Sequence, residues 1–227
     1  MSWVDRFDNK KDPRFRDYTS SAIIGGKRQG KSTLSKLLVE DYQKQYPWRK
    51  ILIYDPSNAF AAKGAFPGYE IITLEELYFG KTVQGEDYQW QRGIMRIQED
   101  KTNKKFAEEF IDYVIEEFRN GLIIIDEATA LMKDKPTNQH TKLLSEHTNW
   151  KVDVMMIFHG LRYVPKRLRG MFWHYYLFKT DEEFEGSKEL GGMNFPRPTD
   201  FYTAWLKAQR APQYEDRIMQ YFTCFNK

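Results

Sequence analysis

The sequence predicts a three-layer α/β/α fold around a largely parallel central sheet, and three observations support this prediction. First, a short apolar strand at residues 22–24 is joined to a helix by the glycine-rich loop GGKRQGKS. Second, the run LIIIDE at residues 122–127 has four consecutive apolar residues, as expected of a parallel strand buried on both faces. Third, further apolar runs alternate with helical patterns along the chain, which is typical of βαβ units.

The other elements follow from the spacing of apolar residues. Helical spacing predicts a helix that begins near Thr33 and ends before Pro47, and another over 106–118 that ends at Asn120 and Gly121. A short helix is expected at 74–78, and Leu143 and Leu144 belong to a further helix. Short apolar runs predict strands at 51–54, 69–72, 93–97, 152–158, 173–178 and 221–225.

Three segments are expected to lie outside these elements. Residues 132–142 and 194–203 are predicted to be loops, because each contains proline among polar residues. The acidic run 181–185 is expected to be solvated surface.

Length and composition indicate one globular domain. A chain of 227 residues with 41% hydrophobic residues is long enough for one sizeable core. We expect an N-terminal arm at 1–20 and a single domain over 21–227, with its core at about 21–180 and a C-terminal extension at about 181–227. The longest apolar run, at 122–125, is too short to span a bilayer, and the charged start of the chain is unlike a signal peptide.

Charge and cysteine content exclude several other classes. The single cysteine, Cys224, excludes an internal disulfide and suits a reducing compartment. The four histidines are scattered without metal-ligand spacing, so no structural zinc site is expected. A net charge of +3 does not by itself indicate nucleic-acid binding.

Residues 25–32 match the pattern G-x-x-x-x-G-K-[ST], which is the phosphate-binding loop or Walker A motif, in the strand–loop–helix context that it requires. Backbone N–H groups of such a loop and the N-terminus of the helix attract phosphate. Lys31 is expected to reach the β- and γ-phosphates, and the Ser32 hydroxyl to ligate Mg²⁺. The predicted nucleotide-binding residues are Gly25, Gly26, Lys27, Arg28, Gln29, Gly30, Lys31, Ser32 and Thr33.

Two strands are predicted to end in acidic residues. Asp126 would hold Mg²⁺ through water, and Glu127 would polarise the attacking water, the pattern of the Walker B motif. The alternative is that this acidic pair caps a helix, but the phosphate loop earlier in the chain favours catalysis. Asp55, which follows the strand at 51–54, either orients water or Mg²⁺ or caps the following turn.

The strand at 152–158 is followed by His159 and then by a basic segment. His159 is the candidate sensor of the γ-phosphate, the alternative being a packed or solvated histidine. The segment LRYVPKRLR at 161–169 holds four basic residues and no acidic one. It is placed where it can meet a phosphate of nucleic acid or of a neighbouring subunit's nucleotide.

With these motifs in this order, the chain resembles the FtsK–HerA superfamily of DNA-translocating ATPases, and within it the genome-packaging ATPases of viruses and phages. The resemblance covers about residues 20–180 and rests on GGKRQGKST, LIIIDEA and MMIFHGLRYVPKRLRG. It implies a P-loop (ASCE/RecA-like) ATPase domain that uses ATP and Mg²⁺. It further implies a homo-oligomeric ring, a pentamer or hexamer, that moves double-stranded DNA into a preformed capsid. The implied partners are capsid or portal vertex proteins, and the implied location is the virion packaging vertex or the host cytoplasm.

The resemblance also suggests roles for single residues. Lys27 lies where packaging motors often place a basic residue within the phosphate loop, from which it would sense the γ-phosphate. His159 stands where the family usually has a glutamine, which is a departure from the pattern. The segments 132–142 and 162–169 are candidate grips on DNA, or else simply surface. An arginine donated by a neighbouring subunit is expected to assist hydrolysis. Many relatives carry it on the helix before the sensor strand, where this chain has only lysines, so the candidates are Arg169 and Arg167 first, then Arg162 and Arg119.

Three alternatives remain at this point. A conjugation or filamentous-phage assembly (Zot-like) ATPase would commonly carry a transmembrane segment or an extra domain, and neither is visible. A GTP-binding switch would need a motif of the type [NT]-K-x-D, and the nearest stretch, NKKF at 103–106, lacks the aspartate. A protein that uses ATP only as structural glue would not need the water activator that Glu127 supplies.

Overall fold

The computed structural model describes residues 18–56, 58, 60, 66, 68–79, 92–95, 104–132, 138–210 and 220–223. Most of the predicted N-terminal arm, Cys224 and residues 80–91 lie outside these described residues. Part of one candidate DNA grip, at 133–137, lies outside them as well.

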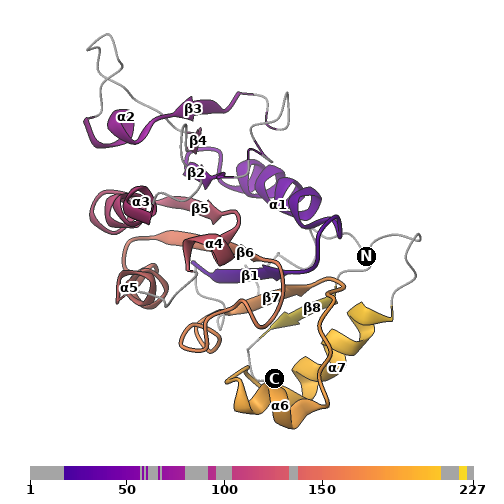
Figure 1. Ribbon diagram of the computed structural model, residues 1–227. Helices are drawn as coiled ribbons and strands as arrows, with labels where there is room; N and C mark the ends of the chain where they lie inside the picture. The colour runs from indigo at the N-terminus through magenta and orange to yellow at the C-terminus, as the bar shows by residue number, and fades with distance from the viewer. Residues whose placement is uncertain are drawn as a thin grey trace.

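The described strands form one sheet of order β3-β4-β2-β5-β6-β1-β7-β8 (Figure 1). Neighbouring strands from β3 to β7 pair in parallel, and β8 pairs antiparallel with β7. The prediction of a largely parallel sheet is therefore confirmed. The strands are β1 Ser20–Ile24, β2 Lys50–Tyr54, β3 Glu70–Ile72, β4 Arg92–Met95, β5 Gly121–Ile125, β6 Val152–Phe158, β7 His174–Leu177 and β8 Gln220–Thr223.

Helices cover both faces of the sheet, which gives the three layers. Successive residues of β1 belong to two different apolar clusters, because side chains alternate between the faces of a strand: Ile23 faces α1, and Ala22 and Ile24 face the helices of the other side. Figure 1 shows α1 on one side of the sheet and α3 and α5 on the other. The helices are α1 Lys31–Gln45, α2 Leu74–Phe79, α3 Lys104–Glu116, α4 Ala128–Leu131, α5 Asn138–Glu146, α6 Ser187–Gly192 and α7 Pro198–Gln209.

Two loop predictions are wrong. Residues 138–142 already belong to α5, whose buried face includes His140 as well as the predicted Leu143 and Leu144. Residues 198–203 begin α7. Pro198 stands at the first position of that helix, where proline is tolerated because the N–H group has no partner within the helix. The proline therefore marks the start of a helix and not a loop.

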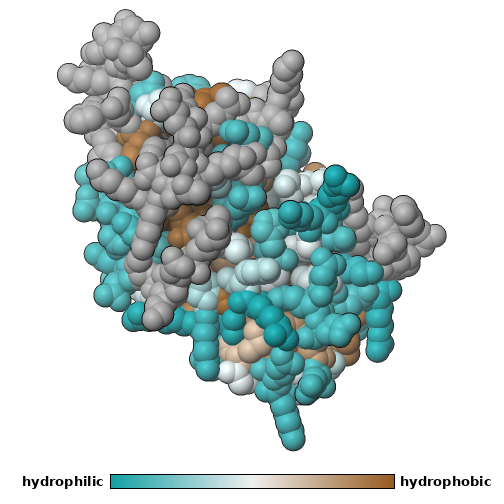
Figure 2. Space-filling view, in the orientation of Figure 1, coloured by the Kyte–Doolittle hydropathy of each residue, from teal (hydrophilic) through white to brown (hydrophobic). Residues whose placement is uncertain are grey.

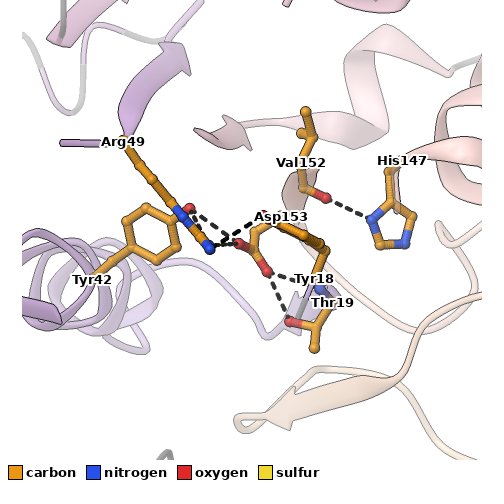
Figure 3. A network of polar contacts seen from close by, with 7 residues as sticks. All are labelled: Tyr18, Thr19, Tyr42, Arg49, His147, Val152 and Asp153. Carbon is orange, nitrogen blue, oxygen red and sulfur yellow. Dashed lines mark hydrogen bonds and ion pairs between the residues drawn. The ribbon is translucent and has the colours of Figure 1, made fainter. Parts of the chain in front are cut away.

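A polar network joins α1 to the amino end of β6, at the edge of the sheet where β6 begins (Figure 3). Asp153 Oδ1 accepts a hydrogen bond from Thr19 N at 2.8 Å, and its Oδ2 accepts one from Tyr42 Oη at 3.0 Å. Arg49 Nη1 lies 3.5 Å from the same Oδ2 and its guanidinium stacks over the Tyr46 ring. Burial raises the pKa of Asp153 to about 6 despite these partners.

The parallel strands bring the predicted motifs to one edge. Ile24 of β1 pairs in register with Phe158 of β6, and Ile125 of β5 pairs with Met156 of β6. Because β5, β6 and β1 are consecutive in the sheet, the segments that follow them are neighbours. None of the described helices is long and apolar enough to cross a membrane. Figure 2 shows that the described surface on the face in view is mostly hydrophilic.

Candidate nucleotide site

Two glycines of the phosphate loop, Gly25 and Gly30, are required, the first by close packing and the second by backbone conformation. Gly26 N donates a hydrogen bond to Lys179 O at 2.8 Å, which ties the loop to the segment after β7. A Cβ atom on Gly25 would lie only 2.6 Å from Cβ of Phe178. Gly30, the residue that precedes α1, has φ of +96°, a conformation that favours glycine. The loop therefore reaches the start of α1 by a path that side chains at these positions would obstruct.

The side chain of Lys31 points into this loop. Lys31 is 8% exposed, and its Nζ donates hydrogen bonds of 2.7 Å to both Gly25 O and Gly26 O. Burial lowers the pKa of Lys31, and the carboxylates at 126–127 partly oppose that shift. These contacts hold the ammonium group inside the loop, where a phosphate oxygen can take the place of the two carbonyl oxygens.

Asp126 and Glu127 follow β5 directly. Asp126 N donates to Tyr54 O at 2.9 Å, so the turn is anchored to β2, and the Asp126 side chain is buried. Glu127 precedes α4 with φ of +50° and makes no side-chain cap bond to that helix. A positive φ is uncommon for a residue other than glycine. The carboxylate of Glu127 is thus available for another use than capping.

His159 lies between the lysine and the glutamate. Its Nδ1 is 3.4 Å from Lys31 Nζ, and its Nε2 is 3.8 Å from Glu127 Oε1. An ammonium can only donate and a carboxylate can only accept, so this arrangement favours the neutral tautomer with the proton on Nε2. Burial has the largest effect on the pKa of His159 and lowers it, and the positive charges of Lys31 and Lys27 lower it further. The negative charge of Glu127 opposes this shift. The structure thus brings together groups up to 128 residues apart.

The donor set at this edge fits a magnesium ion. Ser32 is exposed in the first turn of α1, and Asp126, which follows β5, lies close enough to Lys31 for its charge to act on the pKa of that lysine. Mg²⁺ usually takes only one or two protein oxygens and completes its shell with water and substrate phosphates. Among the described residues, no cluster of three or more His, Cys, Asp or Glu side chains is placed to hold a metal.

The remaining loop residues and Asp55 are placed as follows. Lys27, Arg28, Ser32 and Thr33 are exposed. Asp55 is fully buried, and its Oδ2 accepts a hydrogen bond from Phe60 N at 2.9 Å. The contact supports the turn-capping interpretation of Asp55 over a role at the metal.

The four arginine candidates have different surroundings. Arg169 is only 6% exposed, its Nε and Nη1 donate to two backbone carbonyl oxygens at 2.7 Å, and it stacks over the Phe195 ring. Arg119 donates to three carbonyl oxygens at the end of α3. It lies at the amino end of β5, whereas Glu127 follows the carboxyl end of that strand. Arg162 pairs with Glu189 at 2.9 Å. Arg167 is exposed with one contact, of 3.4 Å to Asn138 Oδ1, among the described residues.

Sequence reasoning missed the segment after β7. Lys179 and Glu182 contact the phosphate loop and the turn after β6, through Gly26 and through the N–H groups of Leu161 and Arg162. The acidic run 181–185 is therefore not only solvated surface. No local pattern identifies Glu182, because its partners are 20 and 21 residues away in the chain.

A parallel sheet with a phosphate loop after β1 and an acidic pair after β5 gives the chain the α/β fold of P-loop NTPases. Solved structures share this fold. The genome-packaging NTPase B204 from Sulfolobus turreted icosahedral virus 2, in complex with ATP-gammaS, superposes with a TM-score of 0.61 and 18% identity over 88% of this chain and 90% of that chain. The structure of the same protein in complex with sulfate superposes with a TM-score of 0.65 and 17% identity over 92% of this chain and 93% of that chain.

VirB4 of Thermoanaerobacter pseudethanolicus gives a TM-score of 0.54 and 10% identity over 87% of this chain and 86% of that chain. At these low identities the likeness shows the fold alone. It confirms the predicted fold class, and it confirms the resemblance to genome-packaging and related ATPases as a resemblance in fold. The chain matches no protein-family model, and a search of curated proteins finds no match.

Proposed function

We propose that the chain is an ATPase that couples hydrolysis to the movement of double-stranded DNA, and that it packages a viral genome into a preformed capsid. The observation that carries this proposal is the meeting of Lys31, His159 and Glu127 at one edge of the sheet, directly before the basic segment 161–169. The likeness in fold to B204, a genome-packaging NTPase, supports the choice of DNA packaging among P-loop activities.

The roles of the residues follow from their chemistry. Backbone N–H groups of the loop and the ammonium of Lys31 hold the β- and γ-phosphates. Ser32 and Asp126 would hold Mg²⁺, which supplies charge neutralisation at those phosphates. Glu127 orients the attacking water and accepts its proton, and the neutral His159 donates from Nε2 to Glu127 or to a γ-phosphate oxygen.

Hydrolysis is proposed to require a neighbouring subunit in a ring of five or six copies. An arginine from that neighbour would stabilise the charge of the transition state. Arg167 suits this role best, because it is exposed and weakly held, whereas the guanidinium of Arg169 is buried against backbone carbonyls. Lys27 is exposed in the phosphate loop and close enough to His159 for its charge to lower the histidine's pKa, which supports a γ-phosphate sensing role.

DNA would be gripped through its backbone. In the turn after β6, Lys166 and Arg167 are exposed, and Tyr163 is 55% exposed. Cations on such a surface bind phosphates without reading sequence. Only Gly160 separates His159 from the basic segment, so a change at the γ-phosphate has a short path to the grip.

The test is hydrolysis and DNA binding by the purified chain and by two variants. Glu127→Gln should lower kcat by about 10²–10⁴-fold while ATP still binds, and Lys31→Ala should abolish ATP binding. Glu117→Gln, an exposed glutamate after α3, and Lys36→Ala are matched controls and should behave as wild type. Undiminished hydrolysis in both site variants would end the ATPase proposal, and hydrolysis with no affinity for duplex DNA would end its DNA part.

A further inference from the structure

Glu182 holds the turn that follows β6. Its Oε2 accepts a hydrogen bond from Leu161 N at 2.6 Å, and its Oε1 accepts one from Arg162 N at 2.7 Å. The carboxylate also packs against Gly160, where an added Cβ atom would lie 2.8 Å from it. Both bonds are short and charge-assisted, the strong class of hydrogen bond in proteins. One side chain therefore fixes two successive N–H groups of this turn.

The segment that carries Glu182 is itself attached to the phosphate loop. Phe178 N donates to Ile24 O and Gly26 N donates to Lys179 O, each at 2.8 Å. Residues 178–182 thus link the loop that follows β1 to the turn that follows β6. If either the loop or the turn moves, this segment must move with it, or the hydrogen bonds between them must break.

His159 depends on this turn for its position. It is followed immediately by Gly160 and Leu161, and the ring contacts Lys31 and Glu127 at 3.4 Å and 3.8 Å, distances longer than those of strong hydrogen bonds. Contacts of that length favour one tautomer only while the ring is held between its two partners. The backbone on either side sets that placement, and it consists of β6 before the ring and the Glu182-bound turn after it.

We propose that Glu182 is a positioning residue for ATP hydrolysis, which acts by fixing the turn that holds His159 between Lys31 and Glu127. The inference rests on the proposed ATPase function and names a residue whose carboxylate accepts hydrogen bonds from backbone N–H groups of the turn after β6. A carboxylate suits the task because it offers two acceptors to two donors. Glutamine offers one oxygen and places an amide donor against an N–H group, so Glu182→Gln loosens the turn with almost no change of shape.

The test compares Glu182→Gln with Glu183→Gln. Glu183 is the exposed neighbour, and its side chain makes no hydrogen bond among the described residues, although its backbone oxygen accepts one from Arg162. Glu182→Gln should lower kcat by about tenfold, the factor that corresponds to roughly 1.4 kcal/mol, while the Kd of a non-hydrolysable ATP analogue stays unchanged. Glu183→Gln should match wild type. An equal fall in both variants, or a changed Kd with an unchanged kcat, would overturn the proposal.

A double-mutant cycle with His159→Gln separates positioning from general support of the fold. If Glu182 acts through His159, the double variant should have the kcat of His159→Gln alone, because the orientation that Glu182 provides no longer matters. Independent, multiplying losses would show that Glu182 acts elsewhere. Should Glu182→Gln fail to fold, as judged from thermal unfolding, Glu182→Asp shortens the reach to the turn and takes its place in the same cycle.

A second readout does not depend on hydrolysis. The ¹⁵N resonances of the His159 ring report its tautomer in the nucleotide-free protein. Wild type and Glu183→Gln should show the proton on Nε2, and Glu182→Gln should show averaged tautomers. If Glu182→Gln shows averaged tautomers but the wild-type protein has no ATPase activity, the proposed function is refuted and the positioning of His159 by Glu182 still holds. Unchanged resonances would refute the positioning role whatever the ATPase result.

Discussion

The substitution Gly25→Ala tests how closely the phosphate loop is packed against Phe178, the residue that follows β7. The new Cβ atom would lie 2.6 Å from Cβ of Phe178. Two carbon atoms are in favourable contact at about 3.5 Å or more, so the backbones must separate by about 0.9 Å at this point. Phe178 cannot yield easily, because its Cβ is attached to a backbone that bonds Ile24 O at 2.8 Å and its side chain is buried.

Overpacking of this kind costs about 1–3 kcal/mol, and for a domain of this size each kcal/mol lowers Tm by about 2–4 °C. We therefore expect Gly25→Ala to unfold at a temperature about 2–12 °C lower. A shift of the loop near 1 Å should also reduce kcat by about 10²-fold, since reacting groups must be held closely. The assays are thermal unfolding by circular dichroism and steady-state hydrolysis of ATP.

The matched control is Gly170→Ala. Its added Cβ would meet nothing within 4 Å, and Gly170 has no positive φ. That variant should keep the Tm and kcat of wild type. If Gly25→Ala is as stable and as active as Gly170→Ala, then the contact between the phosphate loop and Phe178 is looser than the structure indicates, and the steric argument for Gly25 is wrong.

Three further predictions concern protonation and the basic segment. Hydrolysis should fall with decreasing pH as His159 becomes protonated, with a midpoint below pH 6.5 because burial and Lys31 lower the histidine's pKa. A pH profile of kcat/KM in wild type and His159→Gln checks this. The fall at acidic pH should be absent from the variant. The pKa of Asp153 is raised to about 6 from 3.8, so the native state binds its proton more tightly than the unfolded chain does. Its contribution to stability is therefore full below about pH 4 and lost as pH rises through 6, and urea unfolding between those values should show this dependence in wild type but not in Asp153→Asn. Arg169→Ala should lower the free energy of unfolding by roughly 1–3 kcal/mol, since buried carbonyl oxygens lose their donors. Arg167→Ala should change the free energy of unfolding by less than about 0.5 kcal/mol, yet reduce hydrolysis or DNA affinity, and equal stability losses in these two variants would contradict the assigned burial.

The phosphate loop shows what local pattern can predict. A turn of small residues between an apolar strand and a helix is recognised from about fifteen consecutive residues, because its conformation depends on neighbours in the chain. The strands at 51–54, 122–125 and 152–158 were located for the same reason. The error at Pro198 has the same origin, since proline is compatible both with a loop and with the first turn of a helix, and only the packing of Phe201 and Trp205 decides between them.

The sequence by itself determined the parts of the candidate site: the glycine loop with Lys31, the carboxylates at 126–127, and the polar residue that follows β6. The tertiary structure decided which parts meet. The order β5-β6-β1 places His159 between Lys31 and Glu127, buries Arg169 while leaving Arg167 exposed, and brings Glu182 under a turn 20 residues earlier in the chain. Strand order and such long-range hydrogen bonds are set by how the whole sheet and its helices pack, and no spacing of residues within one segment records that packing.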